Sequence, residues 1–139
     1  MTAYDILTNL RSRGEQLDRL SEKLDMLRDA VTHITPAYGE HASGSSQDDK
    51  MAAHAARVDE ILEQQARVRR LQADETVYCV QLAETLEGVK GKLAYSYYAR
   101  SWTLRAFAAA EGYTEGYVRK VKMELDRELR DIQGPYMEE

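Results

Sequence analysis

Apolar residues recur at alternating steps of four and three through the first 34 residues of the chain. Eight of the nine positions on this stripe are apolar, which is the pattern of a heptad seam in a coiled coil. The positions are Ile6, Leu10, Arg13, Leu17, Leu20, Leu24, Leu27, Val31 and Ile34. Arg13 interrupts the seam and Gly14 follows it, so we expect a kink or a weaker segment there. The pattern predicts a long helix over residues 2–34.

The stretch that follows has no such periodicity. Pro36 ends the first helix, because the residue before a proline avoids the helical conformation. Glycine and serine are then frequent in the sequence TPAYGEHASGSSQDDK. We predict a flexible linker over residues 35–50.

A second helical stripe runs from residue 51 to residue 87. Its apolar members are Ala55, Val58, Ile61, Leu62, Val68, Leu71, Tyr78, Leu82 and Leu86. Gln65 and Glu75 fall on or beside this stripe, which is therefore less regular than the first. The simplest arrangement over residues 1–87 is an antiparallel helical hairpin, a coiled coil with the linker as its turn. Because a hairpin buries only one seam, we expect a second copy of the chain to cover the rest.

Residues 88–133 predict a second, smaller helical domain. Gly88 and Gly91 break the second long helix, and residues 92–99 then form a short one. We expect Trp102 to anchor the core of this domain. The inner side of the short helix is expected to carry Leu93, Tyr97 and Tyr98.

The segment TLRAFAAAEGYTEGYVRKVKM predicts two helices joined by a tight turn. Thr103 and Thr114 have the side chains of good N-caps, and they precede helices over residues 104–111 and from 115 to about 130. Gly112 supplies a turn residue that is free to adopt positive φ. After this helix the chain is expected to fray, and residues 134–139 to form a loose tail. The predicted fold class is all-α, a long hairpin followed by a small helix-turn-helix bundle.

Residue spacing within this segment favours a helix-turn-helix over an ordinary pair of helices. Ala108 lies where the helices would cross, Gly112 comes four residues later, and Val118 six residues after that. Small, turn and branched residues at this spacing suit a tight bihelical corner. Further apolar residues that fill the corner are Leu104, Phe107, Val121 and Leu125.

The outward face of the second helix is predicted to be basic. Arg119, Lys120 and Lys122 are placed on it, and the leading end carries Glu115, Gly116 and Tyr117. In a helix-turn-helix this leading end enters the DNA major groove. We expect two later arginines to be structural, paired with acids at helical spacing. They are Arg127 and Arg130.

Charge is distributed unevenly along the chain, whose net charge is −5. Residues 1–87 hold 10 basic and 16 acidic residues, whereas residues 90–133 hold 9 basic and 6 acidic residues. A basic C-terminal module on an acidic helical body is consistent with DNA binding by one face.

The composition disfavours an enzyme, a metalloprotein and a membrane protein. Cys79 and the three histidines, His33, His41 and His54, lack the spacing of a metal motif, and no glycine loop that cradles phosphate is present. Cys79 also lacks a basic neighbour to activate it. No run approaches the roughly 18 apolar residues of a membrane span, and no secretory signal is visible. A single cysteine is typical of a reducing, cytoplasmic compartment. We expect no cofactor.

The segment YYARSWTLRAFAAAEGYTEGYVRKVKMELDREL, residues 97–129, resembles region 4 of the sigma-70 transcription factors, which reads promoter DNA. Over nearly its full length the chain also resembles small phage and prophage proteins of Gram-positive bacteria. Some of these are late-gene transcription activators of the ArpU and RinA kind. The resemblance implies a transcriptional regulator in a bacterial host cell.

This resemblance also implies the residues that contact double-stranded DNA. Base reading falls on Glu115, Gly116, Arg119 and Lys120. From their charge and position, we expect phosphate contacts from Lys120, Lys122 and Arg105, with Thr114 or Tyr117, and weaker attraction from Lys90, Lys92 and Arg100. The N-terminal helices would join two copies or bind RNA polymerase or another phage protein.

Two other functions remain open from the sequence. The chain could be a protein-interaction module that does not read DNA. It could also be a subunit like the small terminases, which join a helix-turn-helix to oligomerising helices for DNA packaging.

Overall fold

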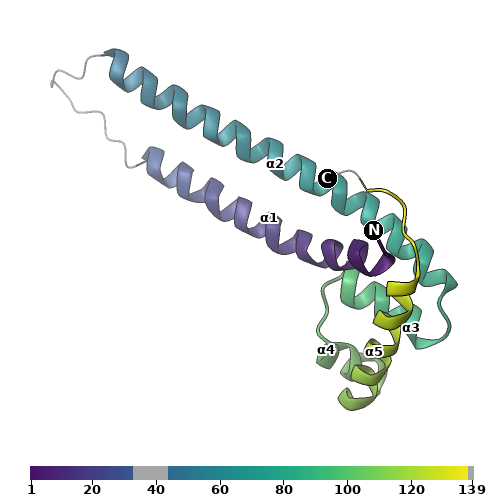
Figure 1. Ribbon diagram of the computed structural model, residues 1–139. Helices are drawn as coiled ribbons and strands as arrows, with labels where there is room; N and C mark the ends of the chain where they lie inside the picture. Colours follow the sequence, from purple (N-terminus) through teal and green to yellow (C-terminus); the bar gives the residue numbers. More distant parts are fainter. Residues whose placement is uncertain (33–43, 138–139) are drawn as a thin grey trace. The chain divides into compact units, whose positions relative to one another are not determined.

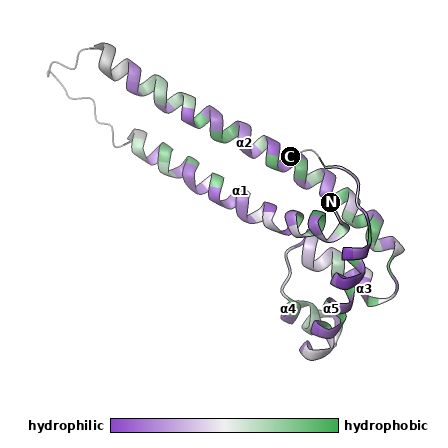
Figure 2. Cartoon of the chain, viewed as in Figure 1, coloured by the Kyte–Doolittle hydropathy of each residue, from purple (hydrophilic) through white to green (hydrophobic). Residues whose placement is uncertain are grey.

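The described residues, 1–32 and 44–137 of the computed structural model, are all-helical and form no β-strand. Two long helices are followed by four short elements (Figure 1). The elements are α1 (Ala3–Thr32), α2 (Gly44–Thr85), α3 (Val89–Ala94), the π-helix η1 (Tyr95–Ala99), α4 (Leu104–Glu111) and α5 (Glu115–Asp131). Hydrophobic and hydrophilic residues alternate along α1 and α2, as expected of amphipathic helices (Figure 2).

Two compact units divide the chain, and each is described here by itself. One unit combines Met1–Gly14 with Arg69–Glu139, and the other is Glu15–Val68. The division differs from the predicted boundary between residues 87 and 88. The start of α1 and the end of α2 belong with the short helices, because their apolar side chains enter the same core as those of α4 and α5.

The unit Glu15–Val68 consists of two helical segments held by a narrow apolar seam. Leu20 and Leu24 of α1 are buried, and so is Gln65 of α2. The Gln65 side-chain amide donates to the Ser21 hydroxyl at 3.2 Å. A polar residue on the predicted stripe is therefore accommodated by a hydrogen bond, as buried polar groups require.

The larger unit holds the main core. Leu7 and Leu10 of α1, Cys79 of α2 and Leu93 of α3 are almost fully buried there. They belong to one cluster with residues of η1, α4 and α5, namely Tyr98, Phe107, Ala108, Val118, Val121, Leu125 and Leu129. This core orients the surface of α5 that the sequence singles out.

Helix boundaries differ from the sequence prediction in two places. The helix α2 begins at Gly44, so the predicted linker is wrong for residues 44–50, while residues 33–43 lie outside the described residues. The stretch after Gly44 contains no proline, so the long helix can extend through it. Gly91 does not break a helix but lies buried inside α3. A Cβ at that position would be 2.5 Å from the Ala83 carbonyl oxygen, so glycine permits α3 to approach α2 closely.

The chain after α5 does not fray at once, contrary to expectation. The Ala3 amide donates to the Ile132 carbonyl at 2.8 Å, and the Gly134 amide donates to the Met1 carbonyl at 3.0 Å. Thr2 and Gln133 form an isolated antiparallel bridge. The predicted loose tail is therefore wrong for Gly134, because both chain ends satisfy each other's backbone groups.

Candidate nucleic-acid interface

Helix α4 begins and ends, and helix α5 begins, where the sequence places their caps. The Thr103 hydroxyl accepts from the Ala106 amide at 3.0 Å, and the Thr114 hydroxyl accepts from the Tyr117 amide at 3.2 Å. Gly112 ends α4 at φ 75°, in the left-handed region. The N-cap threonines and the glycine C-cap thus specify the turn between the helices through local interactions.

Apolar side chains fill the corner between α4 and α5. Phe107 and Ala108 of α4 are buried, and Val118, Val121 and Leu125 of α5 are buried against the same core. Leu104 is only partly buried and packs at the edge. The residues that occupy the inner side of α5 leave the opposite side of the helix free for contact.

The exposed face of α5 carries four basic side chains and no acidic one at its centre. Gly116 and Met123 lie in the middle of this face, and Met123 is 67% exposed. Around them the helical period of 3.6 residues places exposed Arg119, Lys120, Arg127 and Arg130. We call these six residues the basic face of α5.

Glu115 and Arg119 form an ion pair within the first turn of α5. Arg119 Nη2 is 2.8 Å from Glu115 Oε1, and the side chains are 66% and 42% exposed. The pair is open to solvent, so it is worth little stability and separates easily. Glu115 also lies at the positive end of the helix dipole, which favours its charge. Two of the four predicted base-reading residues therefore interact with each other.

Lys122 does not lie on the outward face, so its expected placement is wrong. Its side chain is 15% exposed, and its ammonium is 2.5 Å from Asp126 Oδ2. The same ammonium lies 4.5 Å from the centre of the Tyr97 ring and 5.2 Å from that of Tyr98. Lys122 therefore joins α5 to η1 through a cation–π and ion-pair cluster.

Arg127 and Arg130 were expected to pair with acids, and this expectation is wrong. Arg130 instead lies over the Tyr4 ring at 4.2 Å. Arg127 is exposed and forms no hydrogen bond or ion pair with the described residues. The sequence reasoning missed both as members of the basic face. Their spacing of eight and eleven residues from Arg119 was the signal, because it returns to the same side of a helix.

Of the remaining predicted phosphate contacts, Thr114 and Tyr117 lie at the turn, whereas Arg105 lies at the start of α4. Arg105 is exposed on α4 and has no partner among the described residues. Tyr117 is 42% exposed, and its ring lies 5.1 Å from that of Tyr113. The Thr114 hydroxyl is already used as an N-cap. Of these three, Arg105 is the side chain with a free charge.

The three predicted contributors outside α4 and α5, Lys90, Lys92 and Arg100, each have an intramolecular partner. Lys90 is 2.6 Å from Glu128, and this hydrogen bond raises the pKa of the Lys90 ammonium. Lys92 lies 3.8 Å from Glu111. Arg100 lies 5.1 Å from the centre of the half-buried Trp102 ring. Their free charge is reduced, which weakens their expected contribution to DNA attraction.

Arg11 of α1 supports the segment that leads into α4. Its guanidinium donates to the carbonyls of Tyr97 and Trp102, the latter at 3.0 Å, and lies 3.8 Å from the centre of the Tyr97 ring. Ser101 between them adopts φ 58°, which is uncommon for a residue with a side chain. The sequence reasoning placed Arg11 in no role, although it fixes the entry to α4.

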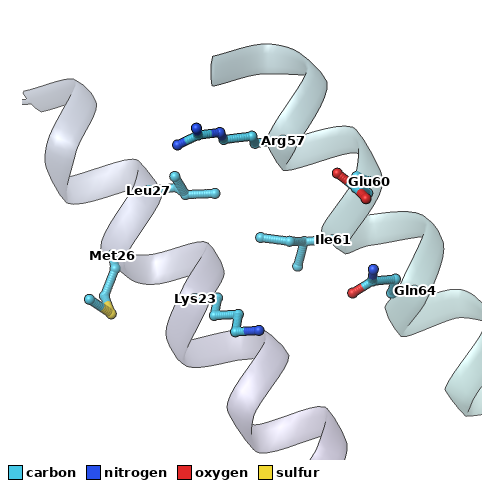
Figure 3. A pocket seen from close by; sticks show the side chains of 7 residues that line it. All are labelled: Lys23, Met26, Leu27, Arg57, Glu60, Ile61 and Gln64. Atoms are coloured by element: carbon cyan, nitrogen blue, oxygen red, sulfur yellow. The ribbon is translucent and has the colours of Figure 1, made fainter. Parts of the chain in front are cut away.

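A further concave surface lies in the smaller unit. It is a groove of about 400 Å³, where Leu27 of α1 and Ile61 of α2 point toward each other (Figure 3). Within residues 1–32 and 44–137, no cluster of three His, Cys, Asp or Glu residues could hold a metal. No described helix is long and apolar enough to cross a membrane.

Comparisons with family models, with curated proteins and with solved structures each find no match to this chain.

Proposed function

We propose that the chain is a phage-type transcriptional regulator that binds promoter DNA through α4 and α5. In this proposal the two helices act as a sigma-70 region-4-like helix-turn-helix, and the start of α5 enters the major groove. The observation that carries the proposal is the basic face of α5, which is exposed on the side opposite the buried valines and leucines.

The charges on this face match the two kinds of contact that DNA offers. Arg119 can make a bidentate contact to a guanine edge, and Lys120 lies beside it for a phosphate or base contact. At 1.5 Å per residue, Arg127 lies about 12 Å further along the axis than Arg119. That separation suits a phosphate contact at the rim of the groove. Arg105 of α4 would hold the backbone on the other side of the turn.

Glu115 gives the proposed site a means of discrimination. Its carboxylate repels phosphate, and it can accept from a cytosine amino group in the major groove. While Glu115 pairs with Arg119 at 2.8 Å, neither group is committed to a base. A base pair that satisfies both groups would replace the ion pair, whereas a wrong base would leave one charge without a partner.

The N-terminal helices have a second role in the proposal. A single helix-turn-helix makes few base contacts, so specificity commonly comes from a dimer. The proposed hairpin of α1 and α2 would join two copies or bind RNA polymerase. An acidic, amphipathic helical body is suited to either partner.

The test is selection of bound fragments from the source genome at two salt concentrations. The wild type is compared with the double variant Arg119→Ala, Lys120→Ala. A matched control, Arg19→Ala with Lys23→Ala, removes the same charge from exposed positions of α1. We expect a discrete site near a promoter for the wild type and the control, lost in the double variant. Affinity should fall steeply with salt, because phosphate contacts release counterions.

Two outcomes would replace this proposal. Equal or no enrichment with all three proteins, at either salt, would indicate a protein-interaction module that does not read DNA. Enrichment near packaging genes, together with a ring much larger than a dimer in light scattering, would indicate a small-terminase-like subunit.

A further inference from the structure

The outer side of α2 in the larger unit carries an exposed apolar strip. Val77 is 57% exposed and Val80 is 39% exposed. Val77 is two residues from both Glu75 and Cys79, so it lies on the side of α2 opposite these buried residues, and Val80 lies beside it one turn later. Ala73, one turn before Val77, is also exposed. Branched residues on a solvated helix face have no advantage in helix propensity, so they suggest a packing partner.

Charges flank this strip in a fixed order. Arg70 lies seven residues before Val77 and Glu84 lies seven residues after it, so all three occupy one line along the helix. Arg70 and Glu84 are both exposed, and neither has a hydrogen bond or ion pair with a described residue. Fourteen residues of helix separate them by about 21 Å, so they cannot pair within one chain.

This order is self-complementary when two copies lie antiparallel. A twofold axis at Val77 places Arg70 of each copy opposite Glu84 of the other, and it brings the valines together at the centre. Isologous dimers require this reciprocity, in which residue i meets residue j and residue j meets residue i. Parallel packing would instead place arginine against arginine and glutamate against glutamate.

The surface beside the strip extends the apolar contact. A groove of about 480 Å³ runs along it, lined by residues that include Val80, Ala83, Leu86, Gly91 and Tyr95. Tyr95 of η1 is 38% exposed at its edge. In the antiparallel arrangement the partner's Arg70 lies next to this groove, near Glu84.

We propose that the outer side of α2 binds the same surface of a second copy, with the helices antiparallel across Val77. The buried pairs would be Val77 with Val77 and Val80, and the flanking ion pairs would be Arg70 with Glu84. The surface is distinct from the basic face of α5, so this inference does not depend on DNA binding.

A charge-swap experiment on the full chain tests the contact. Sedimentation equilibrium without DNA measures dimer dissociation for the wild type, Arg70→Glu, Glu84→Arg and the double swap. Each single swap places like charges opposite each other at two symmetric sites, so we expect dissociation constants raised by about tenfold or more. The double swap restores opposite charges and should return the constant to within about threefold of the wild type.

Control variants separate this contact from general effects of charge. Glu60→Arg and Arg67→Glu alter exposed positions on another side of α2 and should leave dissociation unchanged. Val77→Lys should yield a monomer. Its helical circular dichroism spectrum should be unchanged, because the Val77 side chain is exposed to solvent in the isolated protomer. A wild type that is monomeric at high concentration overturns the inference. Single swaps without effect, or a double swap without rescue, also overturn it.

Discussion

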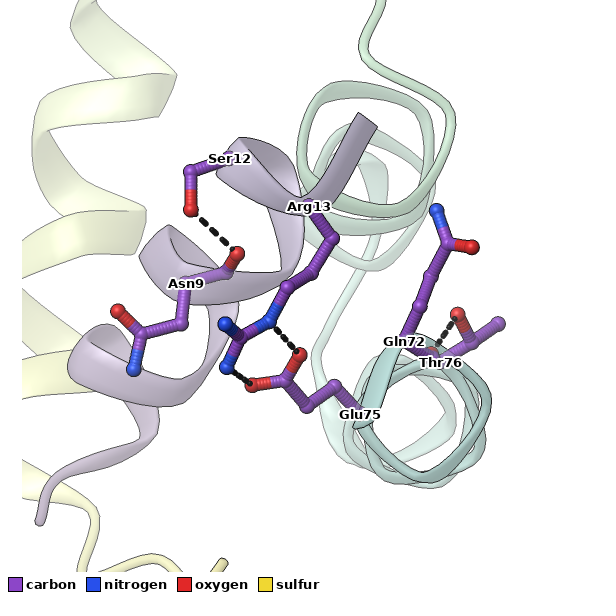
Figure 4. A network of polar contacts seen from close by, with 6 residues as sticks. All are labelled: Asn9, Ser12, Arg13, Gln72, Glu75 and Thr76. Carbon is purple, nitrogen blue, oxygen red and sulfur yellow. Dashed lines mark hydrogen bonds and ion pairs between the residues drawn. The ribbon is translucent and has the colours of Figure 1, made fainter. Parts of the chain in front are cut away.

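Arg13 and Glu75 form a buried, two-point ion pair between α1 and α2. Arg13 Nε is 2.9 Å from Glu75 Oε1, and Arg13 Nη2 is 3.1 Å from Oε2 (Figure 4). Arg13 is 8% exposed and Glu75 is 1% exposed. Arg13, which interrupts the apolar stripe of α1, therefore pairs with Glu75, one of the two polar residues on the stripe of α2. The helix α1 continues through Gly14 without a break.

Removing one member of this pair should destabilise the larger unit more than removing both. Arg13→Leu or Glu75→Leu leaves a buried charge, so we expect a loss of about 3–5 kcal/mol in the free energy of unfolding. The double variant places two leucines in the seam and should be within about 1–2 kcal/mol of the wild type. Urea unfolding of all four proteins measures the coupling. Additive losses would show that the pair does not act as a unit.

Gly91 should not tolerate a methyl group. The Cβ of Gly91→Ala would lie 2.5 Å from the Ala83 carbonyl oxygen, which belongs to the backbone and cannot rotate away. Because α3 would be displaced, we expect the free energy of unfolding to fall by about 1–3 kcal/mol. Gly14→Ala is the control, because its Cβ meets nothing within 4 Å and should stabilise α1 by about 0.5–1 kcal/mol. Equal thermal midpoints for the two variants would contradict this packing.

Tyr98 should make the fold sensitive to alkali. Burial, and then the hydrogen bond to Asp126 at 2.5 Å, raise the pKa of the Tyr98 hydroxyl above its usual value of 10.0. Below pH 10 both states keep the proton, so the full stability is present. Above pH 10 the unfolded chain loses the proton first, so stability falls with rising pH.

Tyr98→Phe is the variant that checks this pH dependence. Because the hydrogen bond is missing, we expect the free energy of unfolding of this variant to be about 1 kcal/mol lower at neutral pH. Between about pH 10 and 11 its free energy of unfolding should decline less than that of the wild type. Tyr136→Phe alters a tyrosine that is 90% exposed and should follow the wild type. The measurement is the denaturant midpoint of each protein across this pH range. If the midpoints of all three proteins fell in parallel, Tyr98 would not be the cause of the sensitivity to alkali.

Cys79 should be protected from thiol reagents in the folded protein. Burial raises the pKa of its thiol to about 11, and Sγ lies 3.8 Å from the Ala94 carbonyl oxygen. At pH 8 about one thiol in a thousand is then ionised, and burial also keeps the reagent from reaching Sγ. Reaction with a disulfide-exchange reagent should be slow in buffer and should accelerate in parallel with unfolding in urea. Rapid labelling of the native protein would show that this part of the core opens.

Gly116 should reveal whether the basic face of α5 approaches DNA closely. A Cβ there meets nothing within 4 Å, so Gly116→Ala should raise stability by up to about 1 kcal/mol. If the DNA backbone lies against the helix at this point, the same methyl should weaken binding severalfold. Gly14→Ala supplies the control, with a similar gain and unchanged affinity. Unchanged binding by Gly116→Ala would remove the glycine from the interface while leaving the role of Arg119 intact.

Local patterns in the sequence were sufficient to predict α1, α4 and the start of α5. Caps and turns depend on neighbouring residues, so Thr103, Gly112 and Thr114 could be assigned directly, and α4 begins and ends where predicted. The buried face of α5 follows from helical periodicity in the same way. The proposed reading of DNA also comes from the sequence, and the experiments above are its test.

Tertiary structure alone decided the roles of charged residues and of the chain ends. Arg13 looked like a defect because its partner Glu75 is 62 residues away, and Lys122 looked exposed because the rings of η1 are invisible to the periodicity of α5. The backbone pairing of Ala3 with Ile132 is likewise non-local. Helix periodicity states which side of a helix a residue occupies, whereas packing determines what lies against that side. That physical difference separates what the sequence determined here from what only the folded chain reveals.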